Sequence, residues 1–149
     1  MKKRFYLQPG KVFVSNENIM VKTVLGSCVS VCLFDKRLKT GGISHFLLPQ
    51  WKGKGLATPR YGNVAINLLY KKMIGAGSSS SDLVSKIFGG AKLVNTGPLS
   101  SHPGILNVKA AKRYLKLLNI DIVSEDTGGH NGRILIFNPP TGTVWVKKN

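Results

Sequence analysis

Only two long segments of this chain carry apolar side chains at helical spacing, and this limits the folds open to it. In residues 105–119, the stripe includes Val108, Ala111 and Leu115, and the basic side chains lie largely outside it. Residues 60–75 repeat the pattern and end at glycine. The other apolar residues stand in short runs separated by turn-forming residues, which is typical of β-strands.

The order of these segments predicts an α/β chain of the α+β kind, with antiparallel-rich β-sheets layered against two main helices. We also expect a short helix after Ser81, with Leu83, Val84 and Ile87 turned inward. At 149 residues the chain is expected to form one domain, residues 1–149. Strands are expected over residues 5–14 (interrupted by a turn), 19–25, 28–34, 42–48, part of 88–94, 120–124, 133–137 and 143–148.

The chain is strongly basic. It has 22 lysines and arginines against six acidic residues, a formal net charge of +16, which favours an anionic partner. The basic residues are scattered and form no recognisable nucleic-acid module, so nucleic acid is not expected as the partner. No segment approaches the roughly 20 apolar residues of a membrane span, and the start does not resemble a signal peptide. These features predict a soluble, cytoplasmic protein without stable membrane insertion.

Both cysteines lie in the apolar run 28–34. Four strand steps of about 3.3 Å would separate Cys28 from Cys32 by roughly 13 Å, beyond disulfide reach, so free thiols are expected. Cys32 is interpreted as a core residue. Cys28 directly follows Gly26 and Ser27, whose small side chains allow a tight turn that exposes a thiol and directs amide N–H groups at a substrate carbonyl. Cys28 is therefore a candidate nucleophile, with a packing role as the alternative.

A nucleophilic thiol needs a base, and the chain has three histidines. His45 lies on the strand expected after that of Cys28, so a hairpin would make the two residues neighbours. Two registers stay open. Paired residue numbers totalling 73 set Cys28 opposite His45, whereas a total of 76 displaces them by roughly 10 Å. A histidine among apolar residues is also often a core or edge residue, and His102 and His130 stand in polar loops where solvated histidine is the default.

Several longer motifs follow one another in a specific order, and in them the chain resembles the CheD family of chemoreceptor glutamine deamidases. The resemblance spans most of the chain. The motifs are TVLGSCVSVCLFD (23–35), GGISHFLLP (41–49), RYGNVAINLL (60–69), KIFGGAKL (86–93), GILNVKAAKRYL (104–115), DTGGHNGR (126–133) and TGTVWVK (141–147).

The resemblance implies a protein-glutamine glutaminase that hydrolyses glutamine side chains of chemotaxis receptors to glutamate and releases ammonia. Cys28 matches the nucleophile, His45 the general base and Thr23 a helper that orients the imidazole. Backbone N–H groups around Gly26 and Ser27 are candidate oxyanion donors in contact with substrate. The reaction requires neither a metal ion nor an organic cofactor.

The resemblance also implies partners, namely methyl-accepting chemotaxis receptors, whose Glu-rich helices would attract a basic chain, and a CheC-type phosphatase. Asn107 matches the asparagine of a family G-x-x-N segment, and the glycine-rich segments 88–91 and 128–133 are expected to shape the site. The chain departs from the family pattern at residues 100–104, which leaves partner contacts open. Two other functions stay open: a regulatory binding module with little catalysis, and a cysteine hydrolase acting on another amide or ester.

Overall fold

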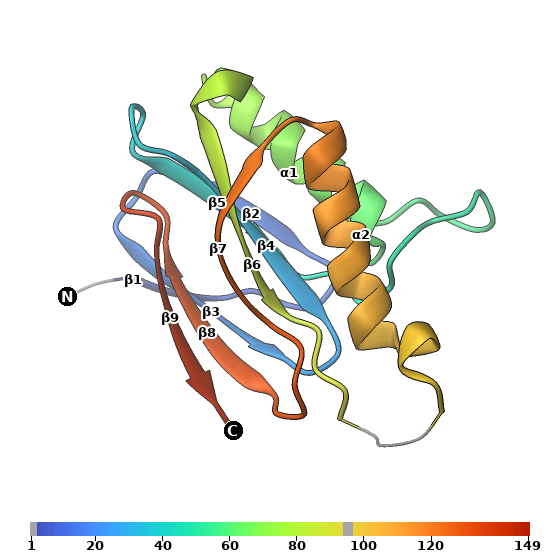
Figure 1. Cartoon of the computed structure of the whole chain (residues 1–149). Coiled ribbons are helices and arrows are strands. Elements are labelled where there is room, and N and C mark those ends of the chain that lie inside the picture. Colours follow the sequence, from blue (N-terminus) through green and yellow to red (C-terminus); the bar gives the residue numbers. More distant parts are fainter. Residues whose placement is uncertain (1–2, 94–96) are drawn as a thin grey trace.

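Two β-sheets pack face to face, and two α-helices cover the outer side of one of them (Figure 1). The computed structural model describes residues 3–93 and 97–149. The strand order is β1-β3-β8-β9 in the four-stranded sheet and β2-β5-β4-β6-β7 in the five-stranded sheet. The elements are β1 (Lys3–Tyr6), β2 (Val12–Ser15), β3 (Ile19–Leu25), β4 (Val29–Asp35), β5 (Thr40–Ser44), α1 (Gly62–Gly75), β6 (Leu83–Gly89), α2 (Pro103–Leu117), β7 (Asp121–Thr127), β8 (Arg133–Asn138) and β9 (Thr143–Lys148).

The expected fold class is confirmed. Within the described ranges, the paired strands run antiparallel except for β1 with β3 and β6 with β7. The helices predicted from apolar periodicity form as α1 and α2, within a few residues of the expected ends. Neither of these described helices is long and apolar enough to cross a membrane.

The core has two parts because β4 is buried on both faces. Val29, Val31 and Leu33 point to one side and pack with α1 and α2. Cys32 points to the other side and packs between the sheets, and Cys28 adjoins the same cluster. Successive side chains of a strand alternate between faces, so a central strand covered on both sides must be apolar throughout. This is why residues 28–34 show no polar face.

The prediction of a short helix after Ser81 is wrong. Only a 3₁₀ turn forms at Ser80–Asp82, and the chain continues as β6 between β4 and β7. Leu83 and Ile87 are both buried as expected, but positions four apart share a face in a strand as well as in a helix. Residues 83–89 form a strand because they pair with β4 on one side and with β7 on the other. A strand is also expected within residues 88–94, after the glycine pair. No strand forms over residues 90–93, and residue 94 lies outside the described residues.

Neither of the two registers considered for the β4–β5 hairpin is right. Asp35 pairs with Thr40 across a loop of residues 36–39, and the paired residue numbers total 75. The Asp35 carboxylate accepts a hydrogen bond from the Leu38 amide at 3.1 Å, which stabilises this wider turn. The isolated bridge between Val29 and Phe46 keeps the same register beyond the end of β5.

Candidate active site

Cys28 lies where the chain crosses from one sheet to the other. β3 ends at Leu25 in the four-stranded sheet, and β4 begins at Val29 in the five-stranded sheet. The thiol of Cys28 is free and half-buried, and it adjoins the cluster between the sheets. Burial raises the pKa of the Cys28 thiol, an effect that its own backbone amide partly opposes. The resting side chain is therefore a neutral thiol at pH 7, and its activation requires a base.

The segment Gly89–Ala91 at the end of β6 holds the turn around Cys28 in place. The amide of Gly90 donates to the Cys28 carbonyl at 2.9 Å, and the amide of Ala91 donates to the Gly26 carbonyl at 3.0 Å. Gly89 has φ +107°, and a Cβ at this position would overlap the Cys28 carbonyl oxygen. Only glycine permits this approach, which gives the FGGA segment a physical role beside the thiol.

Asn107 fastens the same turn from the helical side. Its Nδ2 donates to the carbonyls of Ser27 and Leu47, each at 3.0 Å, and its side chain is fully buried in α2. One amide group thus links the residue before Cys28 to the segment that follows His45. Sequence reasoning found Asn107 only by resemblance. A direct signal was also present, because a buried polar side chain on the inward face of an apolar helix needs partners.

Thr23 and His45 meet in the space between the sheets. The Thr23 hydroxyl donates to the Leu7 carbonyl at 2.9 Å, and its Oγ1 lies 2.6 Å from His45 Nδ1. Because the hydroxyl proton is engaged by Leu7, Oγ1 accepts from Nδ1–H, and this network assigns the proton of the neutral imidazole to Nδ1. Nε2 then carries the free lone pair. The two side chains are 0% and 1% exposed, respectively, so water does not compete for this hydrogen bond.

Cys28 and His45 share one side of the sheet. Val29 and Phe46 exchange backbone hydrogen bonds of 3.1 and 3.0 Å, which sets Cys28 opposite Leu47 and His45 opposite Ser30. Diagonal neighbours of this kind have Cα atoms about 7–8 Å apart, within reach of an imidazole. His45 Nε2 is buried and has no hydrogen-bond partner among the described residues, including Cys28. The structure therefore brings Thr23 and His45 into contact and places Cys28 diagonally opposite His45 in the same register, without a hydrogen bond between the thiol and Nε2.

Burial lowers the pKa of His45 to about 4, because the space between the sheets disfavours an imidazolium. At neutral pH the imidazole is uncharged, and Nε2 is in its proton-accepting form. The resting site thus combines a thiol with a neutral base.

This pKa gives a prediction for stability. The unfolded chain takes up a proton on His45 near pH 6.5, whereas the folded chain does so only near pH 4. His45 therefore contributes stability that is fully present above pH 6.5 and is lost as the pH falls toward 4, by about 3 kcal/mol. Denaturant unfolding from pH 7 to pH 4 should show this extra loss in the wild type and not in His45→Gln. Equal losses in the two proteins would contradict it.

The remaining cysteine and histidines lie elsewhere. Cys32 is fully buried between the sheets, and burial strongly raises the pKa of its thiol. His102 caps α2 by accepting a hydrogen bond from the Gly104 amide at 3.1 Å. His130 lies in an exposed loop, where its Nδ1 is 3.2 Å from the Lys92 carbonyl oxygen. Over the described part of the chain, no group of three or more His, Cys, Asp and Glu side chains is arranged to hold a metal ion.

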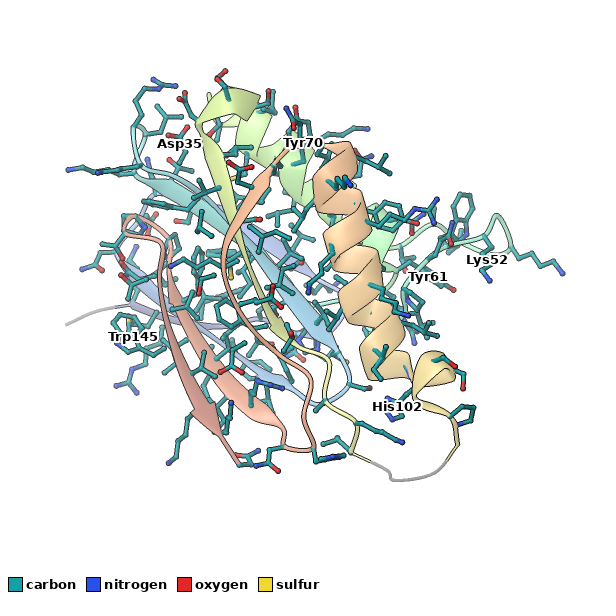
Figure 2. All side chains as sticks on the ribbon, viewed as in Figure 1. Asp35, Lys52, Tyr61, Tyr70, His102 and Trp145 are labelled. Carbon is teal, nitrogen blue, oxygen red and sulfur yellow. The ribbon has the colours of Figure 1, made fainter. Side chains whose placement is uncertain are left out.

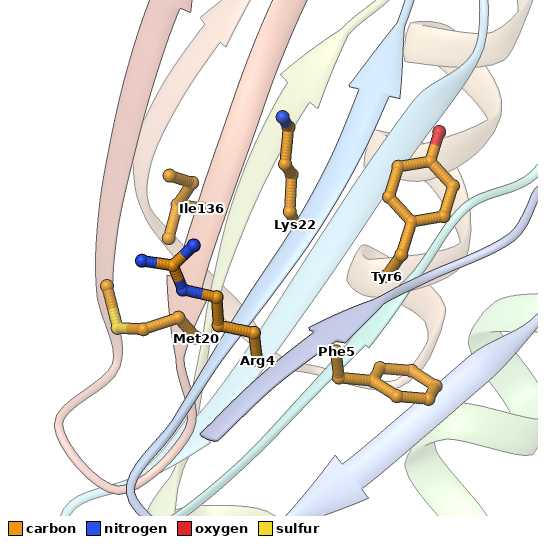
Figure 3. Close-up of a pocket in the computed structure, with 6 residues that line it drawn as sticks. All are labelled: Arg4, Phe5, Tyr6, Met20, Lys22 and Ile136. Atoms are coloured by element: carbon orange, nitrogen blue, oxygen red, sulfur yellow. The ribbon is translucent and has the colours of Figure 1, made fainter. Parts of the chain in front are cut away.

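A surface depression of about 430 Å³ lies on the far face of the four-stranded sheet (Figure 3). Arg4, Tyr6, Met20 and Lys22 are among its lining residues. Lys22 precedes Thr23 in β3, and consecutive strand residues point to opposite faces. The sheet itself therefore separates this depression from the Thr23–His45 pair.

Comparison with known proteins identifies the family. A family model described as CheD chemotactic sensory transduction matches residues 47–148. A protein of Trichlorobacter lovleyi, named probable chemoreceptor glutamine deamidase CheD, is 42% identical over 142 residues, 95% of this chain and 88% of that protein. The chain belongs to the CheD family. Relatives with matching names occur in Sulfurimonas denitrificans (38% identity, 95% of this chain and 92% of that protein) and Anaeromyxobacter dehalogenans (38%, 96% and 83%).

The CheD family model begins after Thr23, Cys28 and His45, so its match rests on the second part of the chain. The alignments to the CheD relatives cover nearly the whole chain. The match to the family model is therefore independent of Thr23, Cys28 and His45.

Proposed function

We propose that this chain is a cysteine-dependent deamidase that hydrolyses glutamine side chains of chemotaxis receptors to glutamate. The observation that carries the proposal is the Thr23–His45 hydrogen bond, which leaves Nε2 unprotonated on the side of the sheet that holds Cys28. The names of the relatives, probable chemoreceptor glutamine deamidases, support the choice of substrate. We therefore expect the chain to act in the cytoplasm, where the target domains of such receptors lie. A CheC-type phosphatase is a proposed partner on family resemblance alone.

In the proposed first half-reaction, Nε2 of His45 removes the Cys28 proton as sulfur attacks the amide carbon. The raised pKa of the thiol and the low pKa of the imidazole favour proton transfer during the attack over a preformed ion pair. Thr23 Oγ1, which accepts from Nδ1–H, helps to stabilise the imidazolium that forms. The imidazolium then protonates the departing nitrogen, so ammonia leaves and a thioester to Cys28 is left.

In the second half-reaction, Nε2 takes a proton from water, and the resulting hydroxide attacks the thioester carbon. The carbon–sulfur bond breaks, the thiol regains its proton, and the substrate side chain leaves as glutamate. Both steps create an oxyanion. The amides of Gly26, Ser27 and Cys28 are its proposed donors, since none of them donates a backbone hydrogen bond to the described residues.

The test is mass spectrometry of a purified receptor cytoplasmic domain incubated with the wild-type chain. Each target glutamine should become about one dalton heavier, as replacement of an amide NH₂ by OH requires, with one ammonia released per event. A receptor domain that binds the chain but gains no mass would refute the deamidase and favour a regulatory binding module. Conversion of short glutamine peptides, with the intact receptor domain unchanged, would instead indicate a hydrolase for another substrate.

A further inference from the structure

A groove of about 270 Å³ runs between α2 and the segment that follows His45. One wall includes Pro49 and Lys52, and Figure 2 shows Lys52 on the loop that projects beside the helices. The other wall is α2. The helix contributes Leu106, Lys109, Ala110, Arg113 and Tyr114.

The α2 wall has the pattern of a surface that receives another helix. Leu106, Ala110 and Tyr114 follow one another at four-residue spacing and form an apolar stripe about 12 Å long. Lys109 and Arg113 run beside this stripe at the same spacing, and both are exposed. A helix with its own apolar stripe and adjacent carboxylates would pack ridge into groove here and pair its acids with these cations.

The charge of this region is unbalanced. Residues 36–81 and 83–120 contain no Asp or Glu, so both helices and the loop beside them lack a carboxylate. Lys112, on α2, pairs with Glu125 of β7 at 3.2 Å. Lys52, Lys109 and Arg113 make no salt bridge to any described residue. The groove therefore offers three unneutralised cations to a ligand.

The groove is linked to the candidate active site through Asn107. Leu106 precedes Asn107, whose amide binds the carbonyls of Ser27 and Leu47. Pro49 lies two residues after Leu47, which stands opposite Cys28 in the strand register. One end of the groove thus lies beside the Asn107 contacts that hold the turn before Cys28.

We infer that this basic groove docks an acidic amphipathic helix of the substrate protein and presents a neighbouring glutamine to Cys28. The inference rests on the proposed deamidase function and adds the surface that would position the substrate helix. A second copy of this chain is a poor occupant, because two bodies of charge +16 repel each other.

The test reverses the charge of the groove and compares it with a matched change elsewhere. The double variant Lys109→Glu/Arg113→Glu alters α2, and the control Lys71→Glu/Lys72→Glu makes the same charge change at exposed positions of α1. Steady-state kinetics would use an intact receptor domain and a short uncharged glutamine peptide. The groove variant should lose about tenfold in kcat/KM on the receptor domain, mainly through KM, and keep wild-type kinetics on the peptide. The wild-type preference for the receptor domain should also shrink as salt is raised.

Other outcomes separate the two proposals. Unchanged receptor kinetics in the groove variant would overturn the docking groove and leave the deamidase intact. An equal loss in the control variant would assign the effect to overall charge and also overturn the groove. If the wild type converts neither substrate, the deamidase proposal is refuted. The groove can then still be tested by measuring, with fluorescence anisotropy, how the receptor domain binds to the two variants. Displacement of the receptor domain by duplex DNA, with no displacement by an acidic helical peptide, would contradict the assigned occupant.

Discussion

Cys28→Ala is expected to lower kcat/KM for receptor deamidation by a factor on the order of 10⁴ or more, because it removes the sulfur that forms the proposed covalent intermediate. Cys32→Ala is the matched control. It removes the same kind of atom, a thiol sulfur, four residues further along the chain, from a fully buried position between the sheets. This control should keep most of the activity and lose only about 1 kcal/mol of stability to the small cavity.

Alkylation gives a second measurement on the same pair. Iodoacetamide should modify half-buried Cys28 in the folded protein and leave Cys32 unmodified, and modified protein should be inactive. The rate of modification should be slow at pH 7 and rise with pH, because the pKa of the Cys28 thiol is raised by burial. Activity that survives Cys28→Ala, or that disappears in Cys32→Ala while the fold is retained, would refute the assignment of the nucleophile.

His45→Gln is expected to lower kcat/KM by about 10³, since it removes the proton acceptor at Nε2. Glutamine can still bond to the Thr23 hydroxyl, so the packing between the sheets should be largely kept. The control is His130→Gln, an exposed loop position, which should retain wild-type kinetics.

The protonation state provides the sharper part of this experiment. In the wild type, activity should fall when His45 becomes protonated at low pH, whereas the residual activity of His45→Gln should lack that acidic limb. A variant that keeps nearly full activity would show that another group accepts the proton. Thermal melts at pH 7 would separate a chemical defect from a folding defect.

The features that the sequence predicted correctly depend on side chains close together in the chain. The stripes of α1 and α2 and the two-sided burial of β4 each follow from the spacing of apolar side chains along one segment. The candidate thiol was also recognisable, because its small neighbours directly adjoin it in the chain.

The parts that the sequence did not reveal depend on distant partners. The register of the β4–β5 hairpin followed from the Asp35–Leu38 contact in a wide turn, which the loop sequence alone left open. β6 became a strand because β4 and β7 pair with it on both sides. The role of Leu7 as acceptor for Thr23 arises from a backbone carbonyl, which no side-chain motif can reveal.

The catalytic set proposed here is divided between two layers. Thr23 belongs to the four-stranded sheet, His45 follows a strand of the five-stranded sheet, and Cys28 ends the crossover between them. A small shear of one layer against the other would pull the imidazole from its hydroxyl anchor while each layer kept its own ladder of hydrogen bonds. Heat inactivation of this protein would then report the loss of packing between the two sheets, and it would precede the unfolding of either sheet.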